Sequence, residues 1–253
     1  ELSDAFHNSM EDPIITMATP AIDWSNAWDY NSLAQLTDGL FIMGYNYFYS
    51  GSNTAGPVSP LGGYYYDLEY TLNDYLNKTQ GQTDKIILGL PYYGYDWPVV
   101  DDIVNSETIA LGVAQIYSEA EPMAQNYGYI WNNASNTAWF SYEINNWHQC
   151  WYDDSLSLTH KYQFAIDNQL SGVGIWALGY DEGYDGLWGA LHEKFTSILI
   201  GDLNLDNEVN IFDVVLLVNI ILGNNEIIDG CDLNNNGEIN ILDVVLLINI
   251  ILN

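Results

Sequence analysis

Residues 38–48 read DGLFIMGYNYF, a turn followed by a short apolar run and then by a cluster of polar aromatic side chains. An apolar run without alternation is typical of a strand that is covered on both faces in a parallel sheet. Helix-compatible stretches occur at 66–78, 155–169 and 184–197. Three other stretches share the apolar pattern: IITMATP (14–20), IILGLPYYGY (86–95) and GVGIWALGYD (172–181). The alternation of the two kinds of stretch predicts βα units around a parallel sheet.

The segment 126–153 interrupts this alternation with the aromatic runs YGYIW, TAWFSY and QCWYDD, and we expect a small antiparallel α+β insertion there. The fold class predicted before residue 200 is therefore α/β, of the (β/α)8-barrel type. A closed barrel has eight strands and typically about 250 residues. Only about the last four strand–helix units are visible here, so half of a barrel is expected to be missing from these residues.

The last fifth of the chain contains an internal repeat. Residues 201–222 read GDLNLDNEVNIFDVVLLVNIIL and residues 231–252 read CDLNNNGEINILDVVLLINIIL, with 15 of 22 positions identical at an offset of 30 residues. Each copy has an oxygen-rich loop followed by an apolar stretch long enough for three helical turns. We therefore predict two domains, at 1–199 and 200–253.

Each repeat has the ligand spacing of a calcium loop. In an EF-hand loop of about 12 residues, oxygen ligands come from positions 1, 3, 5, 7 (through the backbone carbonyl), 9 and 12. The sharp turn at position 6 falls on Asn207 and Gly237. Solvated Asx-rich turns that cap helices are the alternative, but they would not explain six matched positions in each copy. The sequence therefore predicts two Ca²⁺ sites. Their ligands are Asp202, Asn204, Asp206, Glu208, Asn210 and Asp213 in the first loop, and Asp232, Asn234, Asn236, Glu238, Asn240 and Asp243 in the second.

The paired loop–helix repeat resembles the dockerin domain, an all-α pair of calcium loop–helix units that attaches a protein to a cohesin partner. The resemblance implies a cohesin-like or other protein partner. Independently, each helix is apolar on nearly every face, so the two helices cannot bury all of their apolar surface against each other. The remaining apolar surface is expected either to bind another protein or to pack on the chain's own barrel. The positions that read the partner in the family hold Ile211, Phe212, Ile241 and Leu242 rather than small hydroxyl residues. The identity of the partner therefore stays open.

The first part of the chain resembles the second half of a glycoside hydrolase family 18 (chitinase-like) barrel. The family's Met-x-Tyr-Asp motif matches Met43, Tyr45 and Asn46, its GLPxYG motif matches 89–94, and its strand-eight Trp matches Trp176. The resemblance implies an amino-sugar glycan as substrate and substrate-binding roles for Met43, Tyr45, Asn46, Tyr93, Trp97 and Trp176. Flat aromatics ringed by polar groups suit a sugar, which has apolar faces and a polar rim. The alternative is that Trp176 and Tyr45 are ordinary barrel core.

The chain departs from the family at the catalytic acid. The family's general acid is the last Glu of DxxDxDxE, and this motif occurs nowhere in the 253 residues. ELSDAFHNSM (1–10) resembles the helix after that motif, so the sequence is expected to start just beyond it. Asn46 also replaces the family's Asp. Asp23, Asp96 and Asp181 follow predicted strand ends and are candidates to replace the acid, but a role as a loop cap or a rim ligand is favoured for each. We therefore predict that the 253 residues contain no catalytic residue.

Composition limits the classes of function. The chain has 34 acidic residues, four Lys and no Arg, for a net charge of −30, so nucleic acid is an unfavourable partner. No apolar run reaches the roughly 18 residues of a membrane span. Extracellular residence is favoured, and a Cys150–Cys231 disulfide is left open.

Two functional hypotheses follow from the sequence. One is a chitinase-like hydrolase whose first barrel half is an upstream segment or another chain. The other is an inactive binding or assembly subunit that docks to a neighbouring protein or to copies of itself.

Overall fold

The computed structural model describes residues 2–196, 200–204, 206, 208–225, 227–228, 230–234 and 236–252. The chain forms two compact units, Glu1–Lys194 and Phe195–Asn253. The turn position Asn207 lies outside the described residues. In the part of the chain that is described, none of the helices has the length and apolar character needed to cross a membrane.

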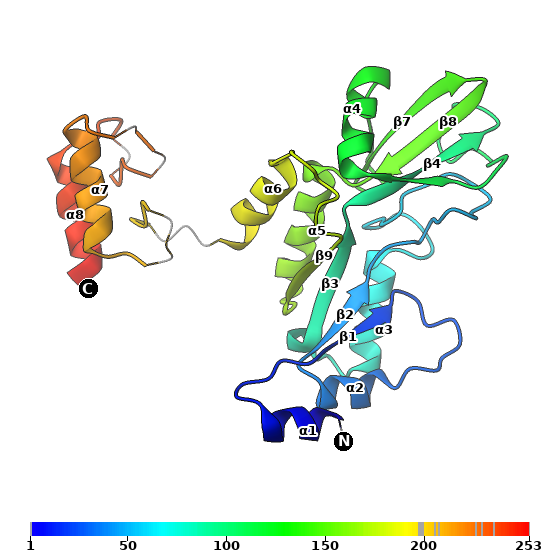
Figure 1. Ribbon diagram of the computed structural model, residues 1–253, viewed down its shortest axis with the longest axis horizontal. Coiled ribbons are helices and arrows are strands. Elements are labelled where there is room, and N and C mark those ends of the chain that lie inside the picture. Colours follow the sequence, from blue (N-terminus) through cyan, green and yellow to red (C-terminus); the bar gives the residue numbers. More distant parts are fainter. Residues whose placement is uncertain are drawn as a thin grey trace. The chain divides into compact units, whose positions relative to one another are not determined.

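A four-stranded parallel sheet forms the centre of the first unit (Figure 1). Its order is β1 (Thr16–Pro20), β2 (Gly39–Met43), β3 (Ile86–Pro91) and β9 (Gly172–Trp176). The helices of this unit are α1 (Leu2–Ser9), α2 (Tyr30–Leu36), α3 (Leu68–Lys78), the 3₁₀ turn η1 (Thr83–Lys85), α4 (Tyr117–Tyr127), α5 (Ser155–Asp167) and α6 (Gly186–Phe195). The predicted α/β class is confirmed. Within the described residues, β1 and β9 each pair on one side only, so the sheet has two open edges.

Local signals set the helix starts. Asp67 caps α3 by accepting a hydrogen bond from the backbone N–H of Tyr70, and Asp154 forms a capping box with Ser157 at the start of α5. Alternate residues of β2, Leu40 and Ile42, are fully buried against the helices. The helices therefore cover one face of the sheet, as a βα architecture requires.

One aromatic ring spans three strands on the other face of the sheet. Phe41 points away from the helix-covered side of β2, and its ring lies where a Cβ atom would stand on Gly89 of β3 and on Gly174 of β9. Glycine at these two positions therefore lets one side chain span three strands.

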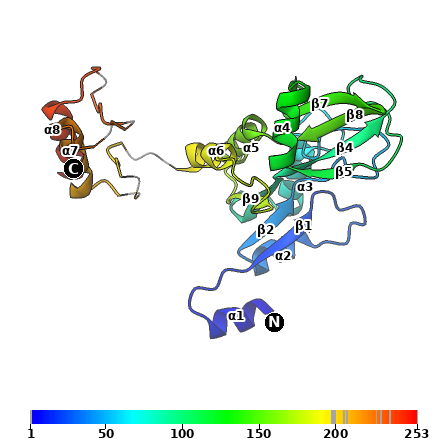
Figure 2. The same cartoon turned by 45° about the horizontal axis from the view of Figure 1, so that its top comes forward.

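The insertion is larger than predicted. It is a five-stranded antiparallel sheet in the order β5-β4-β8-β7-β6, with α4 lying against it (Figure 2). Its strands are β4 (Tyr93–Val99), β5 (Val113–Ile116), β6 (Ile130–Asn132), β7 (Thr137–Ile144) and β8 (Asn146–Tyr152). The predicted start at residue 126 is wrong, because β4 follows β3 after a single residue. A continuous apolar and aromatic run therefore conceals the change from one sheet to the other.

The second unit consists of the two loops followed by α7 (Ile211–Ile221) and α8 (Ile241–Leu252). Its core contains corresponding residues of the two repeats, such as Leu217 and Leu247, together with Cys231. Cys150 and Cys231 are both buried, and no disulfide joins them. Ile211, Phe212, Ile241 and Leu242 are exposed.

Candidate functional site

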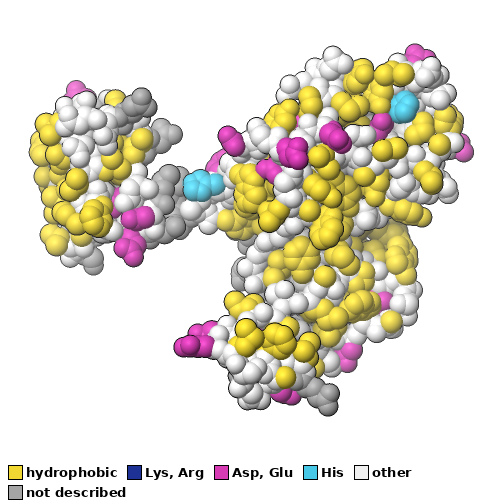
Figure 3. Space-filling view, in the orientation of Figure 1, with side chains coloured by type: hydrophobic (Ala, Val, Ile, Leu, Met, Phe, Trp, Pro, Cys, Tyr) yellow, Lys and Arg dark blue, Asp and Glu magenta, His cyan; other side chains and the backbone are white. Residues whose placement is uncertain are grey.

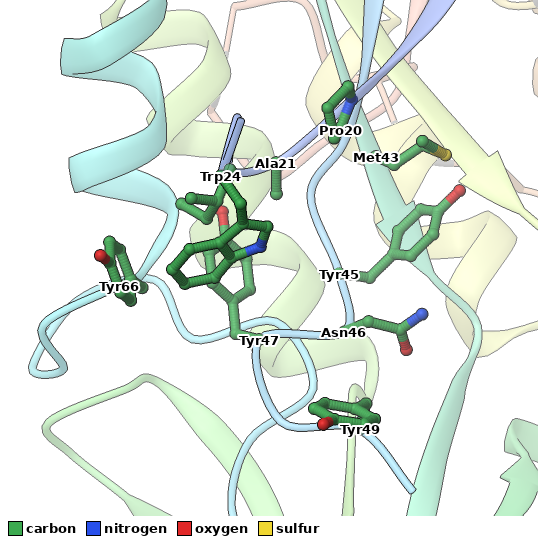
Figure 4. Close-up of a pocket in the computed structure, with 10 residues that line it drawn as sticks. Pro20, Ala21, Trp24, Met43, Tyr45, Asn46, Tyr47, Tyr49 and Tyr66 are labelled. Carbon is green, nitrogen blue, oxygen red and sulfur yellow. The ribbon is translucent and has the colours of Figure 1, made fainter. Parts of the chain in front are cut away.

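A pocket of about 540 Å³ opens at the carboxyl ends of β1 and β2 (Figure 4). Pro20 and Met43 are the last residues of these strands, and the loops that follow supply most of the remaining wall. The carboxyl ends of parallel barrel strands are where such folds place their sites. The residues that line the pocket are Pro20, Ala21, Ile22, Trp24, Met43, Tyr45, Asn46, Tyr47, Tyr49 and Tyr66.

The backbone after β2 turns sharply to present Tyr45 and Asn46. Gly44 donates a backbone hydrogen bond to Gly89 O at 3.0 Å, and a Cβ on Gly44 would overlap that oxygen and the side chain of Leu68. Asn46 has a φ of 64°, in the left-handed region that Asn tolerates better than most residues. Local backbone geometry therefore directs both side chains into the pocket.

A hydrogen bond connects the pocket to the insertion. The hydroxyl of Tyr93 donates to Oδ1 of Asn46 at 2.7 Å, and the rings of Tyr93 and Tyr45 meet edge to face. The Tyr45 hydroxyl makes no hydrogen bond to any described residue. Burial raises the pKa of Tyr45, so its hydroxyl is neutral at physiological pH and can donate to a ligand oxygen.

The other aromatic residues of the wall have different constraints. The Tyr47 hydroxyl is within 2.5 Å of Thr71 Oγ1, and burial raises its pKa, so this hydroxyl is committed to the fold. Tyr49 and Trp24 are exposed, and Trp24 contacts Tyr66 edge to face. The pocket therefore combines flat apolar surfaces with few polar groups, the usual make-up of a small-ligand site.

The six residues predicted to bind substrate fall in different places. Met43, Tyr45 and Asn46 line the pocket, whereas Tyr93 is buried behind Asn46. Trp176 ends β9 at the same edge of the sheet, outside the pocket lining, and is 53% exposed. Trp97 is fully buried in the core of the insertion beside Trp151, so it is not placed to touch a ligand.

The sequence prediction did not name Trp24, Tyr47, Tyr49 and Tyr66, which also line the pocket. They lie in loops, where side chains follow no period that would reveal a common face. The only available signal was the density of Tyr and Trp after the ends of the first two strands.

The three aspartates that follow predicted strand ends lie outside the pocket lining. Asp23 accepts backbone hydrogen bonds from Ala27 and Trp28, which makes it a loop cap. Asp96 accepts a hydrogen bond from the Tyr142 hydroxyl at 2.5 Å within the insertion. Asp181 is buried after β9. The described pocket therefore contains no carboxylate to serve as a general acid.

The two repeat loops share several internal hydrogen bonds at the 30-residue offset. Asp202 Oδ1 accepts from the N–H of Asp206 at 3.1 Å, and Asp232 Oδ1 accepts from that of Asn236 at 3.1 Å. The last carboxylate of each loop closes it in the same way, since Asp213 accepts from Asn210 N–H and Asp243 from Asn240 N–H.

The donor set of these loops suits a hard cation. Each loop gathers Asp and Asn oxygens, and a carboxylate that accepts one or two N–H groups keeps lone pairs for a metal. Among the described residues, no group of three or more His, Cys, Asp or Glu is arranged as metal ligands. Seven of the twelve expected donors are Asn side chains or backbone carbonyls, so such a grouping covers only part of each donor set.

Two family models match the chain. Glycosyl hydrolases family 18 matches residues 1–181, and the dockerin type I domain matches residues 200–252. Type I dockerin domains are calcium-binding modules whose partners are proteins of the cohesin type.

Individual proteins are similar to the first unit. A putative sporulation-specific glycosylase, YdhD of Bacillus subtilis, is 27% identical over 65% of this chain and 39% of its own length. A probable di-N-acetylchitobiase 1 of Dictyostelium discoideum is 28% identical over 70% of this chain and 55% of its own length. A family 18 chitinase of Cycas revoluta, solved in complex with (GlcNAc)3, superposes with a TM-score of 0.67 at 17% identity. That superposition covers 77% of this chain and 59% of the chitinase. The chain thus spans about half the length of these proteins.

Proposed function

Because the chain belongs to glycosyl hydrolase family 18 and carries a type I dockerin domain, we propose that it is an extracellular chitinase-like protein. In this proposal the first unit binds glycans of β-1,4-linked N-acetylglucosamine. The second unit binds Ca²⁺ and attaches the protein to a cohesin-like partner.

The observation that carries the proposal is the pocket at the ends of β1 and β2. Tyr45 offers a neutral hydroxyl with no partner among the described residues, and Asn46 offers an amide held by Tyr93. Both face aromatic walls, so one sugar ring would find apolar contact on its faces and hydrogen bonds at its rim. The Tyr45 hydroxyl is assigned to the N-acetyl oxygen, and Trp176 to the floor beneath a sugar.

Hydrolysis would need a group that these residues do not supply. In the substrate-assisted mechanism of this family, the acetamide of the sugar acts as the nucleophile and an enzyme carboxylic acid protonates the leaving oxygen. The 253 residues contain no DxxDxDxE motif. We therefore propose that catalysis depends on polypeptide outside them, and that Tyr45 would orient the acetamide. Asn46, at a position that is Asp in the family motif, favours the second candidate, a binding or assembly subunit without catalysis.

The second unit is proposed to hold two calcium ions, one in each loop. The ligands are the side chains at loop positions 1, 3, 5, 9 and 12 and the carbonyls of Glu208 and Glu238. Bound calcium would fix the start of α7 and of α8. The exposed residues Ile211, Phe212, Ile241 and Leu242 are the proposed contact surface for the partner.

Isothermal titration with di-N-acetylchitobiose tests the proposal. We expect the chain to bind this disaccharide, and Tyr45→Phe to weaken binding by about two- to tenfold through the loss of one hydrogen bond. Tyr95→Phe is the matched control, because the Tyr95 hydroxyl makes no hydrogen bond to described residues. A chain that binds no N-acetylglucosamine oligomer contradicts the proposal. Turnover of the disaccharide by the chain alone would remove the requirement for an external acid.

A further inference from the structure

The second repeat loop contains two neighbouring residues that can react with each other. Asn236 is followed by Gly237, and glycine follows asparagine nowhere else in the 253 residues. Because glycine has no Cβ to shield its backbone nitrogen, that nitrogen can attack the side-chain amide of the preceding asparagine and close a succinimide ring. Asn236 and Gly237 are both exposed, so water reaches both groups.

The nucleophile of this reaction is the backbone nitrogen of Gly237, and a carboxylate lies beside its proton. The N–H of Gly237 donates a hydrogen bond to Oδ2 of Asp232 at 2.7 Å. A general base must lie within hydrogen-bond reach of the proton that it takes, and Asp232 meets this condition. Oδ1 of the same carboxylate accepts the N–H of Asn236 at 3.1 Å, which fixes the orientation of the carboxylate.

The electrophile is Cγ of Asn236, and a backbone donor holds the oxygen bonded to it. Oδ1 of Asn236 accepts the N–H of Glu238 at 2.8 Å. Negative charge develops on this oxygen when the Gly237 nitrogen bonds to Cγ, so a donor at this distance stabilises the transition state. Because Glu238 follows Gly237, the same hydrogen bond folds the Asn236 side chain back over the nitrogen that attacks it.

The backbone at Gly237 keeps the reacting groups accessible. Its φ is 87°, in the left-handed region that favours glycine, and no atom of the described residues lies within 4 Å of the place of a Cβ. The first loop differs at the position of the electrophile. Its residue there is Asp206, which has no side-chain amide to lose.

We propose that Asn236 and Gly237 form a self-modification site, at which the second loop slowly converts its own asparagine to an acid. The Gly237 nitrogen bonds to Cγ of Asn236 and gives its proton to Asp232. The bond from Cγ to the amide nitrogen then breaks, and that nitrogen leaves as ammonia with the transferred proton. Water opens the succinimide at one of its two carbonyls, which gives either an aspartyl or an isoaspartyl residue at position 236.

The two products would change the loop in different ways. The aspartyl product gives the second loop the carboxylate that the first loop has at Asp206, and added charge favours a hard cation. The isoaspartyl product adds one carbon to the backbone before Gly237 and so shifts Glu238 away from the other ligand positions. Both add a negative charge to a unit that already presents acidic side chains at its surface (Figure 3). The reaction itself does not require the proposed calcium site.

Peptide mapping of the full chain by mass spectrometry tests the proposal. After incubation without calcium in neutral buffer, we expect a gain of about 1 Da at position 236, the difference between an amide and an acid. Methyl transfer by an isoaspartyl methyltransferase identifies the isoaspartyl product. Asn240 is the internal control, because it lies in the same loop but is followed by Ile241, and it should stay intact over the same period.

Two variants separate the reaction from the assistance that the loop gives it. Gly237→Asn introduces the residue that the first loop has at this turn position, and its side chain should slow the gain at position 236 by about tenfold. Asp232→Asn keeps a hydrogen-bond acceptor beside Gly237 but removes the carboxylate, and it should slow the gain several-fold. Equal rates in the wild type and Asp232→Asn would overturn the role of the carboxylate.

An Asn236 that stays unmodified throughout the incubation would overturn the whole proposal, and so would equal modification of Asn236 and Asn240. A parallel incubation with excess calcium tests the proposed function separately. Asn236 is a proposed ligand, so bound calcium should hold its side chain and slow the reaction. Equal rates with and without calcium would contradict the calcium site of this loop and leave the self-modification site standing.

Discussion

The hydroxyl of Tyr93, in the first strand of the insertion, donates a hydrogen bond to the side-chain oxygen of Asn46, in the loop after β2, across 2.7 Å. Two parts of the first unit that are distant in sequence are thereby joined at the pocket. Because Oδ1 of Asn46 accepts this bond, its amide nitrogen remains to donate to a ligand. The insertion thus orients a pocket residue without itself lining the pocket.

Removal of the Tyr93 hydroxyl should free the Asn46 side chain. We expect Tyr93→Phe to lower the free energy of unfolding by about 1 kcal/mol and to weaken disaccharide binding by about two- to tenfold. Urea unfolding and calorimetric titration measure the two effects. If affinity is unchanged while stability falls, the hydrogen bond is structural and does not orient a ligand group.

The packing of Phe41 over Gly174 predicts a position-specific effect within one strand. Gly174→Ala should destabilise the protein by about 1–3 kcal/mol, because the added methyl group overlaps the Phe41 ring. Gly172→Ala is the matched control, since no atom lies within 4 Å of a Cβ there. Urea midpoints compare the two variants. Equal midpoints would show that Phe41 moves aside freely.

Coupling between the two residues can be measured directly. In the double variant Phe41→Ala with Gly174→Ala, the second substitution should cost less than it does alone, because the overlapping ring is gone. Additive costs would contradict the proposed overlap.

Calcium should stabilise the second unit. At a calcium concentration about 100 times the dissociation constant, each site adds about 2.7 kcal/mol to the free energy of unfolding, and a chelator should reverse the gain. We expect calorimetry to give two ions per chain for the wild type and one for Asp243→Ala, which removes the last ligand of the second loop. Asn225→Ala, at an exposed position between the repeats, should keep two. One ion in the wild type would contradict the two-site proposal.

Asp96 predicts a pH dependence of stability. Burial raises the pKa of this carboxyl, while the Tyr142 hydroxyl and the His148 ring partly oppose the shift. A raised folded-state pKa favours the protonated fold, so this contribution is fully present below the unfolded pKa and is lost as pH rises through the folded value. Asp96→Asn, which stays neutral, should therefore be more stable than the wild type at pH 7.

Paired urea titrations at pH 7 and near pH 3.5 check the sign of this effect. The advantage of Asp96→Asn should shrink at the lower pH, where the wild-type carboxyl is protonated. Asp102→Asn, at an exposed carboxylate in the following loop, is the control. An advantage that grows toward low pH would contradict the assignment.

The sequence was informative where chemistry repeats or alternates. Four apolar runs indicated the four parallel strands, and a 30-residue repeat indicated the paired loops. The sequence did not reveal the start of the insertion, because the apolar and aromatic run at 86–95 contains both β3 of the parallel sheet and the first residues of β4 in the antiparallel sheet. Tyr93, Tyr95 and Trp97 alternate along β4 and share a face, so period alone could not tell that Tyr93 reaches the pocket region while Trp97 is enclosed. The loop residues Trp24 and Tyr66 required the three-dimensional arrangement.

The insertion also has a consequence for biosynthesis. β3 and β9 are neighbours in the sheet, yet residues 92–171 separate them in the chain. At translation rates of about 5–20 residues per second, β9 leaves the ribosome roughly 4–16 s after β3. During that interval the edge of β3 has no partner, whereas β7 and β8, joined through Asn145 alone, can pair at once. The β7–β8 hairpin of the insertion can therefore form before β9 is available to complete the parallel sheet.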